Sequence, residues 1–194
     1  MTAPVSPQQV LDFWFDVPGS PAHGESRDVW FRKNPAFDAE VRERFAATHA
    51  AAAHGALAGW ADAPASLLAL IIVTDQFPRN MHRDTPAAFA TDAHALAAAR
   101  TMVAQGWDTQ LLPVMRWFAY LPYEHSEALA DQDLAVRLMR DVAIDARFAD
   151  LPVWAERRQA VVARFGRFPH RNAILGRVST ADEVEFLRQP GSSF

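Results

Sequence analysis

The densest group of chemically capable side chains lies in RFGRFPHRNAILGR, residues 164–177. This stretch holds four arginines and a histidine but no acidic residue, although the whole chain has a formal net charge of -4. Its proline and glycines predict a fixed, non-helical path. Guanidinium groups held in this way can bind a carboxylate or phosphate through two hydrogen bonds. The candidate anion-binding residues here are Arg164, Arg167, His170, Arg171 and Asn172.

A similar string occurs earlier in the chain. Residues 75–80 (DQFPRN) follow one apolar segment, and residues 168–172 (FPHRN) follow another. Two similar loops after two similar helices suggest duplicated helical hairpins. Arg79 and Asn80 therefore join the candidate anion-binding residues, with Asp75 as an acidic partner for the arginines.

The third candidate region is LPYEHSE, residues 121–127, at the expected start of a helix. A histidine beside a carboxylate can act as a general acid or base, or as a metal ligand with its orienting partner. Glu124, His125 and Glu127 are therefore candidate site residues. The alternative is that Ser126 and the acidic residues cap the helix.

Three functions are compatible with these residues. The first is a small-molecule pocket where the three loops converge, in which arginines bind phosphate or carboxylate and His125 or His170 transfers a proton. The second is an interaction module that receives a peptide or an acidic tail on a concave helical face. Arginines on helix faces would favour this module, whereas arginines in loops favour the pocket. The third is a buried polar lattice with a purely structural role.

Composition excludes several classes of function. The chain has no cysteine, which rules out disulfides, thiolate metal sites and a cysteine nucleophile. It has no HExxH, GxSxG, GxGxxG or Walker motif, so no metal site or cofactor is predicted. Its net charge gives no attraction to nucleic acid or to an anionic membrane. Without a secretory signal or a membrane-spanning apolar run, a cytoplasmic location is expected.

The elements that must position these residues are predicted to be helices. Half of the residues are hydrophobic, and helix start and stop signals recur along the chain. Ser6, Asn34 and a capping box of Thr180 with Glu183 are start signals, and Gly166 is a stop signal. In the helix before Gly166, Trp154 is expected to face inward with Val161, Val162 and Phe165.

The apolar run of residues 66–73 could equally be a buried strand, but its length and its preceding cap favour a buried helix. We expect a single all-α domain, residues 1–194, of about eight helices in antiparallel hairpins. The expected helices are 10–15, 35–55, 66–73, 92–105, 113–121, 126–143, 152–165 and 181–187.

Together, these motifs resemble the bacterial family called domain of unknown function 924. The resemblance rests on LDFWF (11–15), IIVTDQFPRNMHRDTPAAFATD (71–92), LPYEHSE (121–127), RFGRFPHRNAILGRVSTADEVEFL (164–187) and PGSSF (190–194). It implies a fold similar to tetratricopeptide repeats, a right-handed stack of helices, and implies no activity. Members often carry a histidine where this chain has Arg158, which argues against a metal site that would use that histidine.

Overall fold

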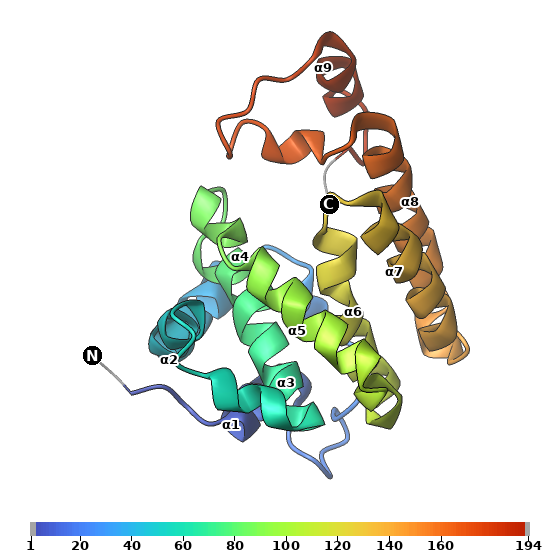
Figure 1. Ribbon diagram of the computed structural model, residues 1–194. Coiled ribbons are helices and arrows are strands. Elements are labelled where there is room, and N and C mark those ends of the chain that lie inside the picture. The colour runs from blue at the N-terminus through green and yellow to red at the C-terminus, as the bar shows by residue number, and fades with distance from the viewer. Residues whose placement is uncertain (1–2, 193–194) are drawn as a thin grey trace. The chain divides into compact units, whose positions relative to one another are not determined.

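The fold was analysed in a computed structural model, which describes residues 3–192 (Figure 1). Helices joined by short loops make up this part of the chain, and no strand occurs in it, so the all-α prediction is confirmed. No helix in this range is long and apolar enough to cross a membrane. The α-helices are α1 (Pro7–Phe15), α2 (Pro35–Ala53), α3 (Pro64–Ile71), α4 (Phe77–Met81), α5 (Asp92–Ala104), α6 (Pro113–His125), α7 (Leu129–Val142), α8 (Leu151–Phe165) and α9 (Ala181–Leu187).

Contacts between residues divide the chain into two compact units. Unit 1 comprises residues 1–83 and 87–122, and unit 2 comprises residues 84–86 and 123–194. The backbone of α6 contributes to both units. The prediction of a single domain over residues 1–194 stays a prediction.

Capping residues explain where α1, α2 and α9 begin. Ser6 and Thr180 form capping boxes before α1 and α9, and Asn34 accepts hydrogen bonds from the first turn of α2. Each side chain satisfies backbone N–H groups that have no partner within the helix. Gly166 ends α8 with a φ of 68°, a left-handed conformation that glycine adopts without a steric penalty.

The core of unit 1 forms around α3, which packs against α1 and α5. Trp14, Phe77 and Phe118 have no exposed surface, and the Trp14 ring meets the other two edge-on at 5.7 and 5.6 Å. Full burial of such a side chain contributes about 1.5–3 kcal/mol. This core holds in place the helical segments that carry Asp75, Arg79 and Asn80.

Residues 75–80 were expected to form a loop, and this prediction is wrong. The chain stays helical from Pro64 to Met81 through a π-helical turn, η3 (Ile72–Gln76). Pro78 has no N–H to donate to the carbonyl of Thr74, and its ring would clash with that carbonyl in a regular α-helix. The wider π turn makes room for the ring, and the hydroxyl of Thr91 donates to the Thr74 carbonyl at 2.6 Å instead.

The expectation that Pro122 ends a helix is also wrong, because α6 continues to His125. The buried Gln132 donates through Nε2 to the carbonyls of Tyr123, Glu124 and Ser126 at 3.3, 2.8 and 2.6 Å. These bonds satisfy carbonyls that the helix end leaves without partners. Ser126 does not cap α7, whose N-cap is Ala128; its hydroxyl donates to Asp131 instead.

In unit 2, α7 and α8 pack side by side as a helical hairpin (Figure 1). Val161, Val162 and Phe168 form a small core against which Phe165 and Phe186 pack. Trp154 was expected to face inward, but 47% of its surface is exposed. The tetratricopeptide-like arrangement stays a prediction.

Candidate functional site

The predicted site residues fall into two groups. Asp75, Arg79 and Asn80 belong to unit 1, and the remaining candidates belong to unit 2. Each group is therefore described within its own unit, and the convergence of all three predicted loops stays a prediction.

Arg79 lies on α4 and not in a loop, and it joins two carboxylates of unit 1. Its Nη1 is 3.2 Å from Oδ1 of Asp75 and 2.8 Å from Oδ1 of Asp92. Burial lowers the pKa of Arg79, but the two carboxylates raise it by more. Nη1 also donates to the Asp75 carbonyl at 2.7 Å, which satisfies a second backbone group of the π turn. The contacts of Arg79 with Asp75 therefore stabilise a helix that contains a π turn.

Asn80 takes part in a second network of unit 1. Its Nδ2 donates to Asp38 of α2 at 2.8 Å, and Arg83 donates to the same carboxylate at 2.6 and 2.8 Å. Burial raises the pKa of Asp38, but the bonds from Arg83 and Asn80 lower it by more. Asp38 was not predicted to join this group, because its position on α2 is typical of a solvent-facing residue.

Unit 1 also contains a pocket of about 260 Å³, which none of the predicted site residues lines. Its walls come from α2, α3, α5, the π turn and the segment before α3, and they are almost entirely apolar. The lining residues are Ala52, Gly55, Leu57, Ala58, Ala61, Leu67, Leu70, Thr74, His94, Ala97, Ala98 and Thr101. The pocket offers no arginine or lysine to an anion and is not the predicted anion pocket.

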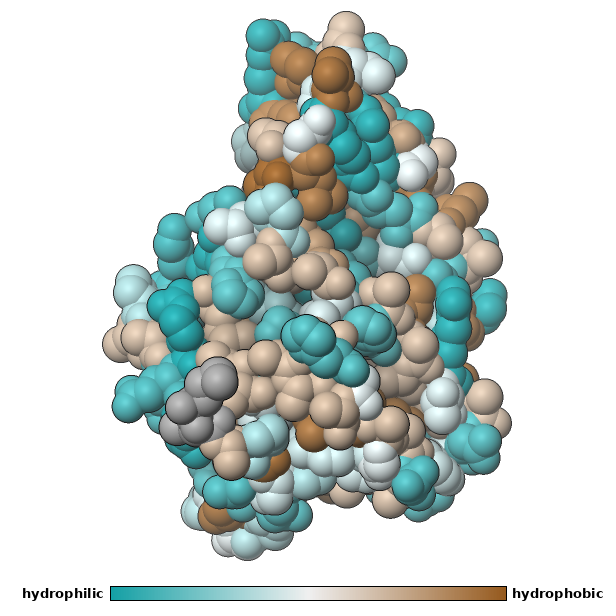
Figure 2. All heavy atoms as spheres, turned by 60° about the vertical axis from the view of Figure 1, so that its left-hand side comes forward, coloured by the Kyte–Doolittle hydropathy of each residue, from teal (hydrophilic) through white to brown (hydrophobic). Residues whose placement is uncertain are grey.

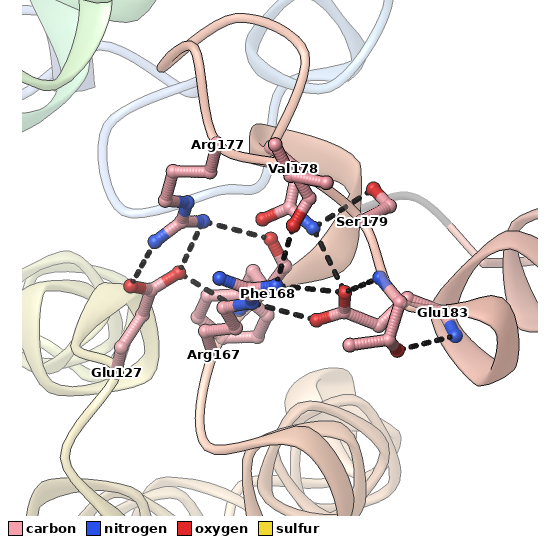
Figure 3. A network of polar contacts seen from close by, with 9 residues as sticks. Glu127, Arg167, Phe168, Arg177, Val178, Ser179 and Glu183 are labelled. Carbon is pink, nitrogen blue, oxygen red and sulfur yellow. Dashed lines mark hydrogen bonds and ion pairs between the residues drawn. The ribbon is translucent and has the colours of Figure 1, made fainter.

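In unit 2, Glu127 ties the loop after α8 to the start of α7 (Figure 3). Its carboxylate accepts two bonds from Arg177, at 2.7 and 3.0 Å, and one from the backbone N–H of Phe168 at 2.8 Å. Burial raises the pKa of Glu127, but these bonds lower it by more. The structure thus brings the first and third predicted regions, residues 164–177 and 121–127, together.

Arg167 pairs with Glu183 of α9, a partner that the sequence did not predict (Figure 3). Its Nε and Nη2 donate to the Glu183 carboxylate at 2.6 and 2.8 Å, and Asn172 adds a bond at 3.2 Å. The bonds from Arg167 contribute most to a pKa of about 2 for Glu183. The sequence identified Glu183 as part of a capping box, which it is, but gave no sign of its ion pair.

The remaining candidates of unit 2 gather near His170. Glu124 is buried and accepts a bond from Arg158 of α8 at 2.6 Å. Arg171 is also buried, with its guanidinium 4.7 Å from the centre of the Phe168 ring. Burial, followed by the positive charges of Arg171 and Arg158, lowers the pKa of His170 to about 4.

Two candidates have weaker links to this group. His125, at the end of α6, is half-buried and close enough to affect the pKa of His170. Arg164 is exposed on α8 and lies over the Phe165 ring at 4.6 Å, away from the charged networks. Within residues 3–192, no three histidine, aspartate or glutamate side chains are placed to hold a metal ion.

The site residues missed by the sequence analysis are Asp38, Arg83, Asp92, Arg158, Arg177 and Glu183. Arg177 belongs to the basic stretch already noted, so its charge was a usable signal. The others pair with residues distant in the chain, and spacing alone does not indicate such partners.

Comparison with known proteins supports the fold and leaves the chemistry open. A solved structure of a protein of unknown function from Agrobacterium tumefaciens, ATU0120, is 37% identical, with a TM-score of 0.83; the match covers 93% of this chain and 96% of the other. No curated protein matches the chain. The family described as bacterial protein of unknown function (DUF924) matches residues 10–191, and the chain therefore belongs to this family, as its motifs indicated.

Proposed function

We propose that unit 2 binds a small anion, through a carboxylate or phosphate group, beside His125, Arg158, His170 and Arg171. The observation that carries the proposal is the concentration of basic groups around one imidazole. Beyond the effect of burial, the charges of Arg171, Arg158 and His125 lower the pKa of His170 by repelling its proton, whereas the carboxylate of Glu127 raises it by less. A bound anion would relieve this repulsion, which is the usual physical reason for such a cluster in a binding site.

The positions of these groups suit recognition of a planar or tetrahedral anion. Arg171 is 7% exposed and packs on the Phe168 ring, so its guanidinium is positioned before a ligand arrives. The half-buried His170 is neutral at pH 7 and keeps one N–H donor. Neutral imidazole and guanidinium donors together match the acceptors of a carboxylate or phosphate.

The nearby ion pairs provide the frame for this site. Arg177 with Glu127 and Arg167 with Glu183 each form two hydrogen bonds that hold the segment between α8 and α9. These two arginines are therefore assigned to structure, and the ligand is assigned to the residues around His170. This assignment combines two alternatives that the sequence left open: a buried polar lattice with a structural role and a small-molecule pocket.

The test is a proton NMR titration of His170 with and without inorganic phosphate or succinate. The expected result is a pKa near 4 in the free protein that rises when the anion is added. The rise should disappear in Arg171→Gln and persist in Arg188→Gln, which removes an exposed arginine paired with Glu185. Circular dichroism checks that both variants fold.

A thermal-shift series gives a second measurement of the same binding. An anion at 100 times its Kd should stabilise the protein by about 2.7 kcal/mol, visible as a higher Tm. If neither anion changes the His170 titration or the Tm, unit 2 does not bind anions of this class and the proposal is wrong.

A further inference from the structure

The solvent-facing side of α8 combines exposed apolar and basic residues. Val153 and Trp154 near its start are 46% and 47% exposed, and Arg157, Ala160 and Arg164 are exposed further along. Positions 153, 157, 160 and 164 follow the spacing of one helix face. Trp154 lies at the edge of this face, with the Arg157 guanidinium 4.8 Å from its ring centre. We call these five residues the α8 face.

The arginines of the α8 face differ from most other arginines of unit 2. The arginines that form ion pairs are Arg140, Arg147, Arg158, Arg167, Arg177 and Arg188. Arg157 and Arg164 instead lie over the rings of Trp154 and Phe165, and neither forms an ion pair within residues 3–192. Their charges are therefore available to carboxylates from another molecule.

We infer that the α8 face docks an acidic, amphipathic segment of a partner protein. Tryptophan and arginine are enriched at the residues that dominate binding energy in protein interfaces. Arg157 and Arg164 are seven residues apart, about 10 Å along the helix axis. A partner helix with acidic residues at the same spacing can pair with both arginines, while its apolar residues cover Val153 and Trp154.

Charge separates this partner from other anionic surfaces. The chain has a formal net charge of -4. A nucleic acid or an anionic bilayer would meet this negative charge over a wide area. A short acidic segment meets only the two arginines and the apolar residues beside them. The inference is independent of the proposed anion site, since it uses none of the residues around His170.

The experiment is a selection from a displayed library of random peptides on the purified full chain, with counter-selection on Arg157→Glu/Arg164→Glu. The enriched peptides are expected to combine apolar residues with aspartate or glutamate. The charge-reversed variant should bind them at least about tenfold more weakly. The matched control is Arg147→Glu/Arg188→Glu, which makes the same charge change at two other exposed arginines of unit 2 and should bind like the wild type.

A charge swap sharpens the result. Peptides in which lysine replaces the acidic residues should bind the charge-reversed variant and not the wild type. Trp154→Ala should weaken the original peptides without changing this preference. The inference is wrong if selection returns no peptide, if enriched peptides lack acidic residues, or if they bind the charge-reversed variant equally well. It is also wrong if phosphatidylglycerol vesicles or an oligonucleotide bind the wild type through these two arginines.

Discussion

The two units place arginines against carboxylates in different ways. In unit 1, Arg79 pairs with Asp75, one helical turn earlier in the same continuous helix. In unit 2, Arg177 and Glu127 are 50 residues apart, and Arg177 comes from a segment outside the α-helices. The first pair is set largely by local helix geometry, whereas the second requires the chain to fold before its members meet.

The two similar strings of sequence, residues 75–80 and 168–172, also fold differently in the two units. In unit 1, Pro78 is accommodated inside a helix by the π turn. In unit 2, Gly166 ends α8 first, and Pro169 then begins a single 3-10 turn, η7 (Pro169–Arg171). The residues that precede each proline therefore decide whether the arginine after it lies on an α-helix, as Arg79 does, or in a short 3-10 turn, as Arg171 does.

Arg79→Ala should have the largest effect on stability, because it leaves the fully buried Asp75 without its ion pair and the π turn without a donor. The expected loss is about 3–5 kcal/mol in the free energy of unfolding, measured by urea denaturation. The control Arg32→Ala removes an exposed pair with Asp28 and should cost about 0–1 kcal/mol. Equal effects of the two changes would contradict the assignment of Arg79 to the core of unit 1.

His170→Gln should change the pH dependence of stability. The folded protein lowers the pKa of His170 from 6.5 to about 4, so the unfolded chain binds the proton more readily between these values. This contribution is complete above pH 6.5 and is lost as the pH falls towards 4, by roughly 3 kcal/mol. Denaturation in a buffer without phosphate should show a smaller loss for the variant than for the wild type. Parallel curves would show that His170 titrates normally.

Arg177→Ala should have the smallest of these effects. It removes two bonds to the half-buried Glu127 and one to the Phe168 carbonyl, which predicts a loss of about 1.5–3 kcal/mol. Proteolysis in the segment after α8 should become faster in the same variant, since the loop loses its tie to α7. Arg188→Ala serves as the exposed control and should leave both measurements unchanged. If the Arg177→Ala variant is as stable and as protease-resistant as the wild type, the Arg177–Glu127 pair is not what holds the segment after α8.

Local signals predicted most of the fold. Ser6, Asn34, Gly166 and Thr180 mark helix ends by chemistry that acts within a few residues, and the structure confirms each of them. The two internal prolines were misinterpreted, because the hydrogen bonds that stabilise the helix around or after them come from elsewhere in the chain. Thr91 donates to the Thr74 carbonyl that Pro78 cannot bond, and Gln132 donates to carbonyls at the end of α6.

The candidate site was predicted less completely than the fold. Its basic residues stand out by composition, but composition does not reveal which carboxylate each one meets. Arg167 pairs with Glu183, which the sequence presents as part of a cap. Trp154 was misplaced because periodicity identifies helical spacing and not which side is covered.

The π turn has a consequence for insertions and deletions. Its five residues take up one residue more than an α-helical turn, so α3 and α4 keep their orientations with an extra position between them. Loss of one residue within Ile72–Gln76 would restore a regular helix and leave both flanking segments facing the same way, but the ring of Pro78 would then clash with the carbonyl four residues before it. The same loss inside α3 or α4 would rotate the residues beyond it by about 100°. A deletion at the π turn should therefore be tolerated once Pro78 is also replaced, whereas a deletion on either side of the turn should not.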